Sequence, residues 1–376
     1  MQSMDVHAHA TTIVDHSVSI EAGDNVMIRA PSVAEDLVVA LYERCGERGA
    51  TPMLVSGGSP RTGLARAERA FLRVGDPDEF ALAEHQLAAM EATDVVILIF
   101  GSRNINETSD VDPAATSAYR AVQKPILDEQ LAKRWVITQF PTPADAQKAA
   151  MSTAAYEEFV YNAIDKDWAA QREHQEQMVE RLDAAAEVRI VSGETTDMTM
   201  TVGAMTTGND YGKQNLPGGE AYTVPVPDSV EGAVLFDKPV VWEGREIEDA
   251  FLRFEDGEVV AHSASKNETM LTSILETDPG ARRLGELGIG MNRDIDRFTS
   301  NILFDEKMGD TIHLAVGQAI EECVPEDMEL NESAQHVDMI VDMSEDSIIE
   351  LDGDVVQRDG TFVFEDGFEP ERAASR

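Results

Sequence analysis

The chain has 376 residues, 43% of them hydrophobic, which is enough for two domains that each bury a core. Its 71 acidic residues against 30 basic ones give a net charge of −41, which argues against binding to nucleic acid or anionic membranes, since both require basic patches. Lysine is scarce, with eight residues, and the acids are spread through segments that can fold. This composition predicts adaptation to high salt, where screening removes the repulsion between carboxylates.

The compartment follows from cysteine content and hydropathy. Cys45 and Cys323 are expected in different domains, so a disulfide framework is not predicted and a reducing cytoplasm is favoured. No apolar run approaches the ~20 residues that cross a bilayer, and the first residues lack the features of a signal peptide. We therefore expect a cytoplasmic protein. His7, His9 and His16 are expected in a flexible or exposed segment.

The first half of the sequence alternates strand and helix patterns. The run from Asp94 to Phe100 is apolar throughout, as in a strand buried on both faces. The βαβ order predicts an α/β N-terminal domain with a doubly wound parallel sheet. Three helical stretches follow between Pro143 and Ala186, and the last is expected to link the domains. Residues 1–186 are thus predicted to form the N-terminal domain with its linking helices.

The second half has short strands separated by turns. Asp256-Gly257 and Asp352-Gly353 each predict a hairpin. One helix is expected from Glu268 to Leu287, and strands resume at residues 311–316 and 337–341. Residues 187–376 are thus predicted to form an α+β, mostly antiparallel C-terminal domain.

Five residues of this second half carry chemistry that can meet at one point. Glu220 follows two glycines and opens a strand-like run, so its carboxylate is held by extended backbone. His313 shares a strand face with the small residues Ala315 and Gly317. His336 and Asp338 also share one strand face because they are two residues apart. Glu286 lies near the end of the expected helix, between two glycines.

Two interpretations of these five residues are open from spacing alone. As ligands they combine two imidazoles with three carboxylates and no thiolate, a set that suits Zn²⁺, Co²⁺ or Mn²⁺ in a hydrolytic site. Alternatively, strand histidines are more commonly hydrogen-bonding residues of a folded core, and in so acidic a chain a glutamate is usually a surface residue.

Several stretches carry a family resemblance, in the same order as in the family. With them, nearly the whole chain resembles the thermophilic metallo-aminopeptidase family, the type of aminopeptidases T and S and related leucyl aminopeptidases. The matching stretches are residues 215–220 (NLPGGE), 278–286 (DPGARRLGE), 301–307 (NILFDEK), 311–317 (TIHLAVG) and 331–338 (NESAQHVD).

The resemblance implies a dimeric two-metal aminopeptidase that removes N-terminal residues from peptides and uses zinc or cobalt. Mapped residue by residue, it places the ligands of two divalent ions per chain at Glu220, Glu286, His313, His336 and Asp338. We assign Glu286 as the catalytic base on chemical grounds. Some members of the family carry a tyrosine seven positions after the first ligand histidine, where this chain has Ile320. Either this branch works without the tyrosine, or another group such as Tyr211 or Tyr222 takes its place, or activity is weakened.

Two other functions stay open at this point. One is a metal-dependent amidohydrolase that acts on a non-peptide amide with the same centre. The other is a metal-binding or peptide-binding relative without catalysis. All five ligand types are present, which favours an active enzyme.

Overall fold

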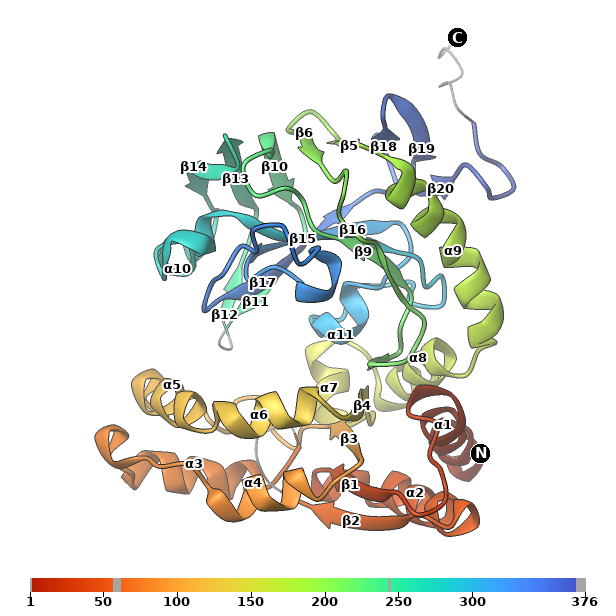
Figure 1. Cartoon of the computed structure of the whole chain (residues 1–376), viewed down its shortest axis with the longest axis vertical. Coiled ribbons are helices and arrows are strands. Elements are labelled where there is room, and N and C mark those ends of the chain that lie inside the picture. The colour runs from red at the N-terminus through yellow and green to blue at the C-terminus, as the bar shows by residue number, and fades with distance from the viewer. Residues whose placement is uncertain (1, 57–61, 243–244, 370–376) are drawn as a thin grey trace. The chain divides into compact units, whose positions relative to one another are not determined.

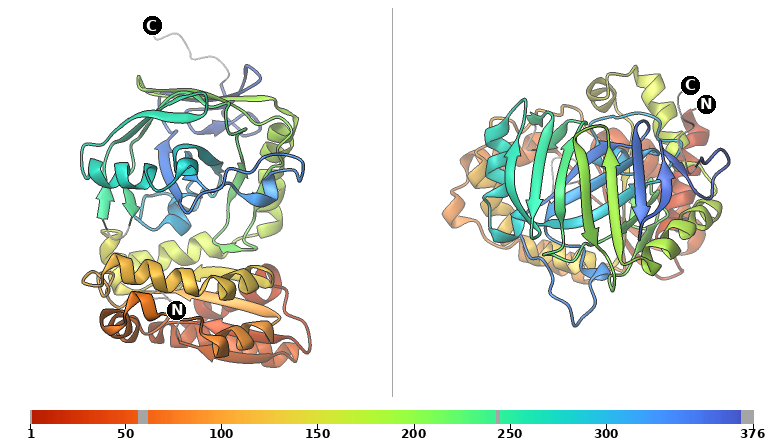
Figure 2. Two further views of the ribbon diagram at one scale, coloured as in Figure 1. Left: turned by 60° about the vertical axis from the view of Figure 1, so that its left-hand side comes forward. Right: turned by 90° about the horizontal axis from the view of Figure 1, so that it is seen from above.

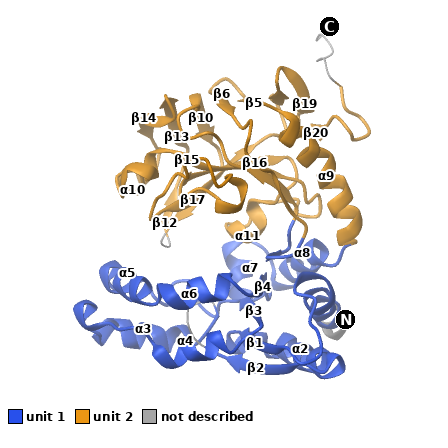
Figure 3. Cartoon of the chain, in the orientation of Figure 1, with its two compact units in different colours: residues 1–166, 212–218 blue, residues 167–211, 219–376 orange. Residues whose placement is uncertain are grey.

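Figure 1 shows the computed structural model of the chain, which describes residues 2–56, 62–242 and 245–369. The chain forms two compact units, drawn in different colours in Figure 3. Unit 1 contains residues 1–166 and 212–218, and unit 2 contains residues 167–211 and 219–376. Among the described residues, no helix has the length and apolar character needed to span a membrane.

Unit 1 is an α/β unit built on a parallel sheet of five strands in the order β2-β1-β3-β4-β8. The central strand β3 is buried from Val95 to Ile99, which confirms the strand predicted to be covered on both faces. The order reverses between β1 and β3, as in doubly wound sheets, and helices surround the sheet (Figure 1). The strands are β1 (Asn25–Arg29), β2 (Thr51–Val55), β3 (Val95–Phe100), β4 (Arg134–Gln139) and β8 (Asn215–Leu216).

The helices of unit 1 alternate with its strands, as the sequence predicts. Residues 77–92 contain a 3-10 turn followed by α4, and residues 113–133 contain the two helices α5 and α6. The helices are α1 (Gln2–Thr11), α2 (Glu35–Arg48), α3 (Ala65–Val74), α4 (Glu84–Glu91), α5 (Pro113–Val122), α6 (Lys124–Leu131), α7 (Pro143–Lys148) and α8 (Thr153–Ile164).

The N-terminal segment differs from expectation. Helix α1 continues into a π-helical turn, Thr12–Ser17, and His9 on α1 is only 1% exposed. The histidine Nε2 lies 2.7 Å from Thr138 Oγ1 on β4, so this residue belongs to the core of unit 1. The exposed position predicted for His9 was therefore wrong.

Unit 2 is an antiparallel sandwich. Its eight-stranded sheet has the order β14-β13-β10-β6-β5-β18-β19-β20 and is seen face-on in the right panel of Figure 2. Its five-stranded sheet has the order β17-β16-β15-β9-β7, and one hydrophobic core contains side chains of both sheets. The strands are β5 (Glu187–Ser192), β6 (Thr196–Thr201), β7 (Gly208–Asp210), β9 (Glu220–Thr223), β10 (Glu231–Phe236), β11 (Val240–Trp242), β12 (Arg245–Ile247), β13 (Ala250–Glu255), β14 (Glu258–Ser263), β15 (Leu284–Gly290), β16 (Thr311–Gly317), β17 (His336–Asp342), β18 (Ser347–Leu351), β19 (Asp354–Arg358) and β20 (Thr361–Phe362).

The helices of unit 2 are α9 (Trp168–Ala184), α10 (Glu268–Leu275) and α11 (Ile302–Asp305). Helix α9, expected to link the domains, contributes Met178, Val179 and Leu182 to the core of the sandwich. It therefore belongs to unit 2, and the units divide before α9 instead of at the expected boundary between residues 186 and 187.

One predicted element was of the wrong type. The helix expected from Glu268 to Leu287 ends at Leu275 as α10, and Leu284–Gly290 forms β15, all seven residues of which are buried. Strand β15 lies between β9 and β16, in the interior of the five-stranded sheet. The segment carries three glycines, which are poor helix formers, and its neighbours supply hydrogen bonds on both edges.

Candidate metal centre

The five predicted ligand residues lie on neighbouring strands of the five-stranded sheet. Residues that face each other across paired strands point to the same side of a sheet. Glu220 on β9 pairs with Gly290, and Gly288 pairs with His313 on β16. Glu286 on β15 pairs with Ala315, which in turn pairs with Asp338 on β17, while Gly317 pairs with His336. All five side chains therefore share one face, and the opposite face contributes Leu287, Ile289, Ile312 and Leu314 to the core.

Small residues on this face leave room for the larger ones. A Cβ atom on Gly288 would lie 1.9 Å from His313 Cε1, so the imidazole occupies the space above this glycine. Ala315 separates Glu286 from Asp338, and Gly317 lies opposite His336. The structure confirms the predicted face of small residues beside His313.

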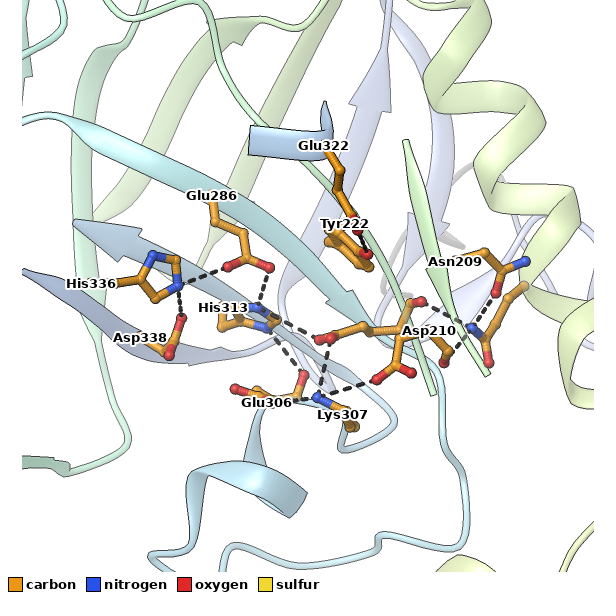
Figure 4. Close-up of polar contacts among 12 residues, drawn as sticks. Asn209, Asp210, Tyr222, Glu286, Glu306, Lys307, His313, Glu322, His336 and Asp338 are labelled. Carbon is orange, nitrogen blue, oxygen red and sulfur yellow. Dashed lines mark hydrogen bonds and ion pairs between the residues drawn. The ribbon is translucent and has the colours of Figure 1, made fainter. Parts of the chain in front are cut away.

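Figure 4 shows the polar ends of Glu286, His313, His336 and Asp338 close to one another. Glu286 contacts both histidines: its Oε1 is 3.3 Å from His313 Nε2 and its Oε2 is 3.1 Å from His336 Nε2. His336 Nε2 is also 3.3 Å from Asp338 Oδ1, and His313 Nε2 is 3.7 Å from Glu220 Oε2. One ligand atom each of Glu286, His313 and Asp338 lie within 4.8 Å of one another, close enough to hold a single ion.

The backbone fixes which nitrogen of each imidazole faces this point. His313 Nδ1 lies 3.1 Å from the carbonyl oxygen of Glu306, and His336 Nδ1 lies 2.7 Å from that of Gln318. A carbonyl oxygen only accepts, so each Nδ1 carries a proton and donates it. Each Nε2 atom is then the nitrogen that faces the cluster, the arrangement that orients histidines in metal sites.

The charges of the cluster are strongly perturbed. Burial opposes the charged form of His313, but hydrogen bonding and attraction to Glu286, with smaller contributions from Glu220 and Asp338, raise its pKa to about 10. Burial acts against His336 as well, yet Asp338 and Glu286 raise its pKa to about 12. Burial raises the pKa of Glu220 to about 8, although Lys307 and His313 act in the opposite direction. The carboxylates thus favour positive charge on the imidazoles, and a divalent ion competes with protons for the same Nε2 atoms.

The donor set fits a divalent cation. Glu220 is 5% exposed, and its Oε2 accepts no hydrogen bond from any residue that the structure describes. A buried carboxylate oxygen without a donor is costly unless a cation lies beside it. Nitrogen and oxygen donors without thiolate suit zinc, cobalt or manganese in a catalytic site. They are less typical of a closed structural zinc site.

Three further residues of the centre, Lys307, Glu306 and Asp210, were not assigned a role from the sequence. Lys307 follows α11 and is fully buried, with its Nζ 3.1 Å from Glu220 Oε1 and 3.6 Å from Asp210 Oδ2. It also forms an ion pair with Glu306. Lys307 lies in the stretch 301–307 that carries the family resemblance. A charged residue within that matching stretch is the sequence feature that could have identified Lys307 as part of the centre.

Helix α9 holds the backbone of β9 in place. Gln175 is fully buried, and its Nε2 lies 2.9 Å from the carbonyl oxygen of Glu220 and 3.0 Å from that of Asp210. Gln171 on the same helix donates to the carbonyl oxygen of Met291, directly after β15. Glu220 is therefore fixed at its backbone by α9 and at its carboxylate by Lys307.

The two tyrosines considered in place of Ile320 have different surroundings. Tyr222 lies two residues after Glu220 on the same face of β9, its hydroxyl donates to Glu322, and its ring packs in a small cluster that includes Ile320. A Cβ on Gly208 would lie 2.1 Å from Tyr222 Cζ, so this glycine makes room for the ring. The ring of Tyr211 instead contacts Arg172, whose Cζ lies 5.0 Å from its centroid. Tyr222 is thus the tyrosine on the ligand face.

Two imidazoles and several carboxylates on one sheet face of the sandwich fit a metal-dependent enzyme. Residues 2–368 match the family described as thermophilic metalloprotease (M29), and the chain belongs to this family. It is therefore a metal-dependent peptidase, a hydrolase.

Two curated proteins illustrate the similarity. Aminopeptidase AmpS of Bacillus subtilis is 25% identical over 415 residues, covering 96% of this chain and 99% of that protein. Aminopeptidase T of Thermus aquaticus is 28% identical over 391 residues, covering 92% of this chain and 93% of that protein.

Solved structures confirm the predicted fold class. Wild-type AmpT from Thermus thermophilus superposes with a TM-score of 0.84 at 24% identity, covering 96% of this chain and all of that one. A 2,5-dihydroxypyridine dioxygenase from Pseudomonas putida has a TM-score of 0.60 at 15% identity and covers 97% of this chain. The same fold thus occurs in proteins with different names, and function must be argued from the site.

Proposed function

We propose that the protein is an aminopeptidase that removes N-terminal residues from peptides with a water molecule activated by two divalent metal ions. The observation that carries the proposal is the convergence of His313 and His336, through their Nε2 atoms, on both oxygens of Glu286. Glu220 and Asp338 flank this group, one beside each histidine. The curated relatives named aminopeptidase support the choice of substrate.

Each side chain has a role in this proposal. When bound, ions of this kind would supply Lewis acidity, which lowers the pKa of water and polarises the scissile carbonyl. Glu220, Glu286, His313, His336 and Asp338 would hold the ions. Glu286 accepts the proton of the water at a carboxylate oxygen and transfers it to the leaving amine. An acidic side chain beside the centre would bind the positively charged amine of the substrate, which would favour the N-terminal residue over internal ones.

The native metal is proposed to be zinc or cobalt, with manganese as a further candidate, because imidazole and carboxylate donors suit all three. We also propose that the protein works at high salt and in the cytoplasm. The support for both is the net charge of −41, the scarcity of lysine and the two free cysteines.

A homodimer is also part of the proposal. Strand β2 is at an edge of the sheet of unit 1 and exposes Met53 (43%) and Leu54 (46%). Exposed apolar side chains on an edge strand are frequently covered by another chain. Light scattering after gel filtration in molar potassium chloride measures the mass, and a monomer at all concentrations would contradict this part.

The test of the proposal uses the full chain in molar potassium chloride, stripped with a chelator. Aminoacyl p-nitroanilides are assayed while Co²⁺, Zn²⁺ or Mn²⁺ is titrated, and the same peptide with a free and an acetylated N-terminus is compared. We expect activity to return as about two ions bind per chain, and only for the free N-terminus. Asp338→Asn should lose a metal and most of the activity.

Asp342→Asn is the matched control, because Asp342 is on the same strand but pairs with Lys238, 2.7 Å away. It should retain metal and activity. Hydrolysis of non-peptide amides alone would establish the amidohydrolase instead. Metal binding without turnover of any amide would establish a non-catalytic relative.

A further inference from the structure

Lys307 occupies an unusual position for a charged side chain. It is fully buried, and carboxylates of Glu220, Glu306 and Asp210 surround its Nζ. A lysine is rarely fully buried unless it is paired, because removing its charge from water is costly. Here Lys307 is paired with carboxylates of the metal centre and with one carboxylate on β7, the strand that pairs with β9.

The lysine contacts one oxygen of Glu220 and leaves the other. Its Nζ is 3.1 Å from Oε1. Oε2 points to His313, 3.7 Å from Nε2, and accepts no hydrogen bond from the described residues. The two oxygens of Glu220 therefore have different surroundings, one beside a fixed cation and one beside a ligand nitrogen.

Two neighbouring residues orient two ligands at once. The carbonyl oxygen of Glu306 accepts the hydrogen bond of His313 Nδ1, and the next residue, Lys307, holds Glu220 Oε1. An ion pair with the side chain of Glu306 also holds the ammonium group of Lys307. One short segment after α11 thus sets the direction of both His313 Nε2 and Glu220 Oε2.

We propose that Lys307 is a positioning residue whose ammonium holds Glu220 Oε1 and so limits Glu220 to a single metal-ligating oxygen, Oε2. The inference rests on the proposed function, because it concerns the metal that Glu220 holds. A lysine that only compensated charge would not select which oxygen of Glu220 binds the metal. A lysine that only stabilised the fold would leave the coordination of the metal unchanged.

The test compares Lys307→Met, which has a similar length and no charge, with the wild type. Binding of Co²⁺ is measured by calorimetry, and its coordination by visible absorption. We expect an affinity 10–100-fold lower, as is typical for loss of an outer partner of a ligand. The absorption spectrum should also change, because Glu220 is then free to rotate or to bind through both oxygens.

Two comparisons isolate the effect. Lys238→Met removes a partly buried ion pair with Asp342 elsewhere in unit 2, and should leave Co²⁺ affinity and spectrum unchanged. In a Glu220→Gln background, Lys307→Met should change the affinity by less than about twofold, because coupled residues lose their effect together. Equal losses in both backgrounds would overturn the inference, as would an unchanged affinity and spectrum in Lys307→Met.

Failure of the inference differs from failure of the proposed function. Two bound metals and peptide hydrolysis in the wild type, with no effect of Lys307→Met on metal binding, would end only the inference. If Lys307→Met does not fold, a crystal structure of the zinc-loaded wild type decides. Glu220 Oε1 on Lys307 with Oε2 on zinc supports the inference, and both oxygens on one zinc ion overturns it.

Discussion

Histidines in the interior of this chain, two buried and one partly buried, differ in their pKa because their neighbours differ. His313 and His336 lie against carboxylates, which raise the pKa of His313 to about 10 and that of His336 to about 12. His9 is as buried as His313 but contacts no carboxylate among the described residues, and burial alone lowers its pKa to about 3. Thr138 donates to the carbonyl oxygen of Leu216, so His9 Nε2 must donate to Thr138 Oγ1, and its Nδ1 has no partner among the described residues.

His9 should make the stability of the protein depend on pH. The unfolded histidine titrates at about 6.5 and the folded one at about 3, so the unfolded state binds more protons between these values. The stability contributed by neutral His9 is present above pH 6.5 and is lost as the pH falls toward 3. Between pH 7 and pH 5 the loss is about 2 kcal/mol.

Urea unfolding of the wild type and of His9→Gln at these two pH values measures this loss. We expect the free energy of unfolding of the wild type to fall by about 2 kcal/mol more than that of the variant. His7→Gln is the control, because His7 is exposed on the same helix, and its pH dependence should match the wild type. Equal slopes for the wild type and His9→Gln would contradict the assignment.

At the scale of the elements, strand β15 decides how the centre is built. It places Glu286 between β9 and β16, and Gly288 gives the His313 ring its space. The sequence suggested a helix here because the preceding residues continue a helical pattern from α10. A β-bulge interrupts the register between Leu284 and Glu286, so this stretch lacks the regular alternation of a strand.

Gly288→Ala should displace His313 while the sandwich stays folded. The new Cβ would lie 1.9 Å from His313 Cε1 and 2.2 Å from Nε2, so the ring must move away from Glu286. We expect loss of bound metal and a decrease in kcat/KM of about 100-fold, since misplacement by about 1 Å has effects of this size. Metal analysis and steady-state kinetics measure both.

Gly46→Ala is the matched substitution without a clash. Gly46 lies inside α2, and nothing is within 4 Å of its added Cβ. Because alanine is the better helix former, this variant should be more stable by about 1 kcal/mol and keep wild-type activity. If Gly288→Ala retained full metal content, the space argued for His313 would not be required.

At the scale of the whole molecule, charge sets the conditions of stability. A net charge of −41 destabilises the folded state through repulsion when salt is low. Salt shortens the screening length from about 10 Å at about 0.1 M to about 3 Å at about 1 M. The melting temperature should therefore rise steeply with potassium chloride over this range.

A series of thermal melts in potassium chloride checks this expectation, with choline chloride as a second salt and sorbitol as an uncharged control. Screening predicts similar rises in the two chlorides and a smaller one in sorbitol at equal osmolality. A melting temperature that does not depend on salt would remove the support for a high-salt habitat.

Local pattern in the sequence determined much of the fold and the types of ligand. The continuous apolar run of β3 predicted a central parallel strand, and the alternation in residues 311–316 placed His313 opposite Ile312 and Leu314. His336 and Asp338 were placed on one face by the same period of two. These features depend on neighbours along the chain, so periodicity is enough to predict them.

The tertiary structure alone decided how these pieces meet. Lys307 contacts Glu220 across 87 positions of sequence, and neither residue's local pattern contains that contact. Leu216 returns to unit 1 to pair with Thr138 on β4, and Leu284–Gly290 becomes a strand because it lies between two others. Whether a charged side chain is buried or a strand edge is covered depends on the path of the whole chain. Hydrogen-bond partners and pKa shifts are therefore decided by the tertiary structure and not by the local sequence.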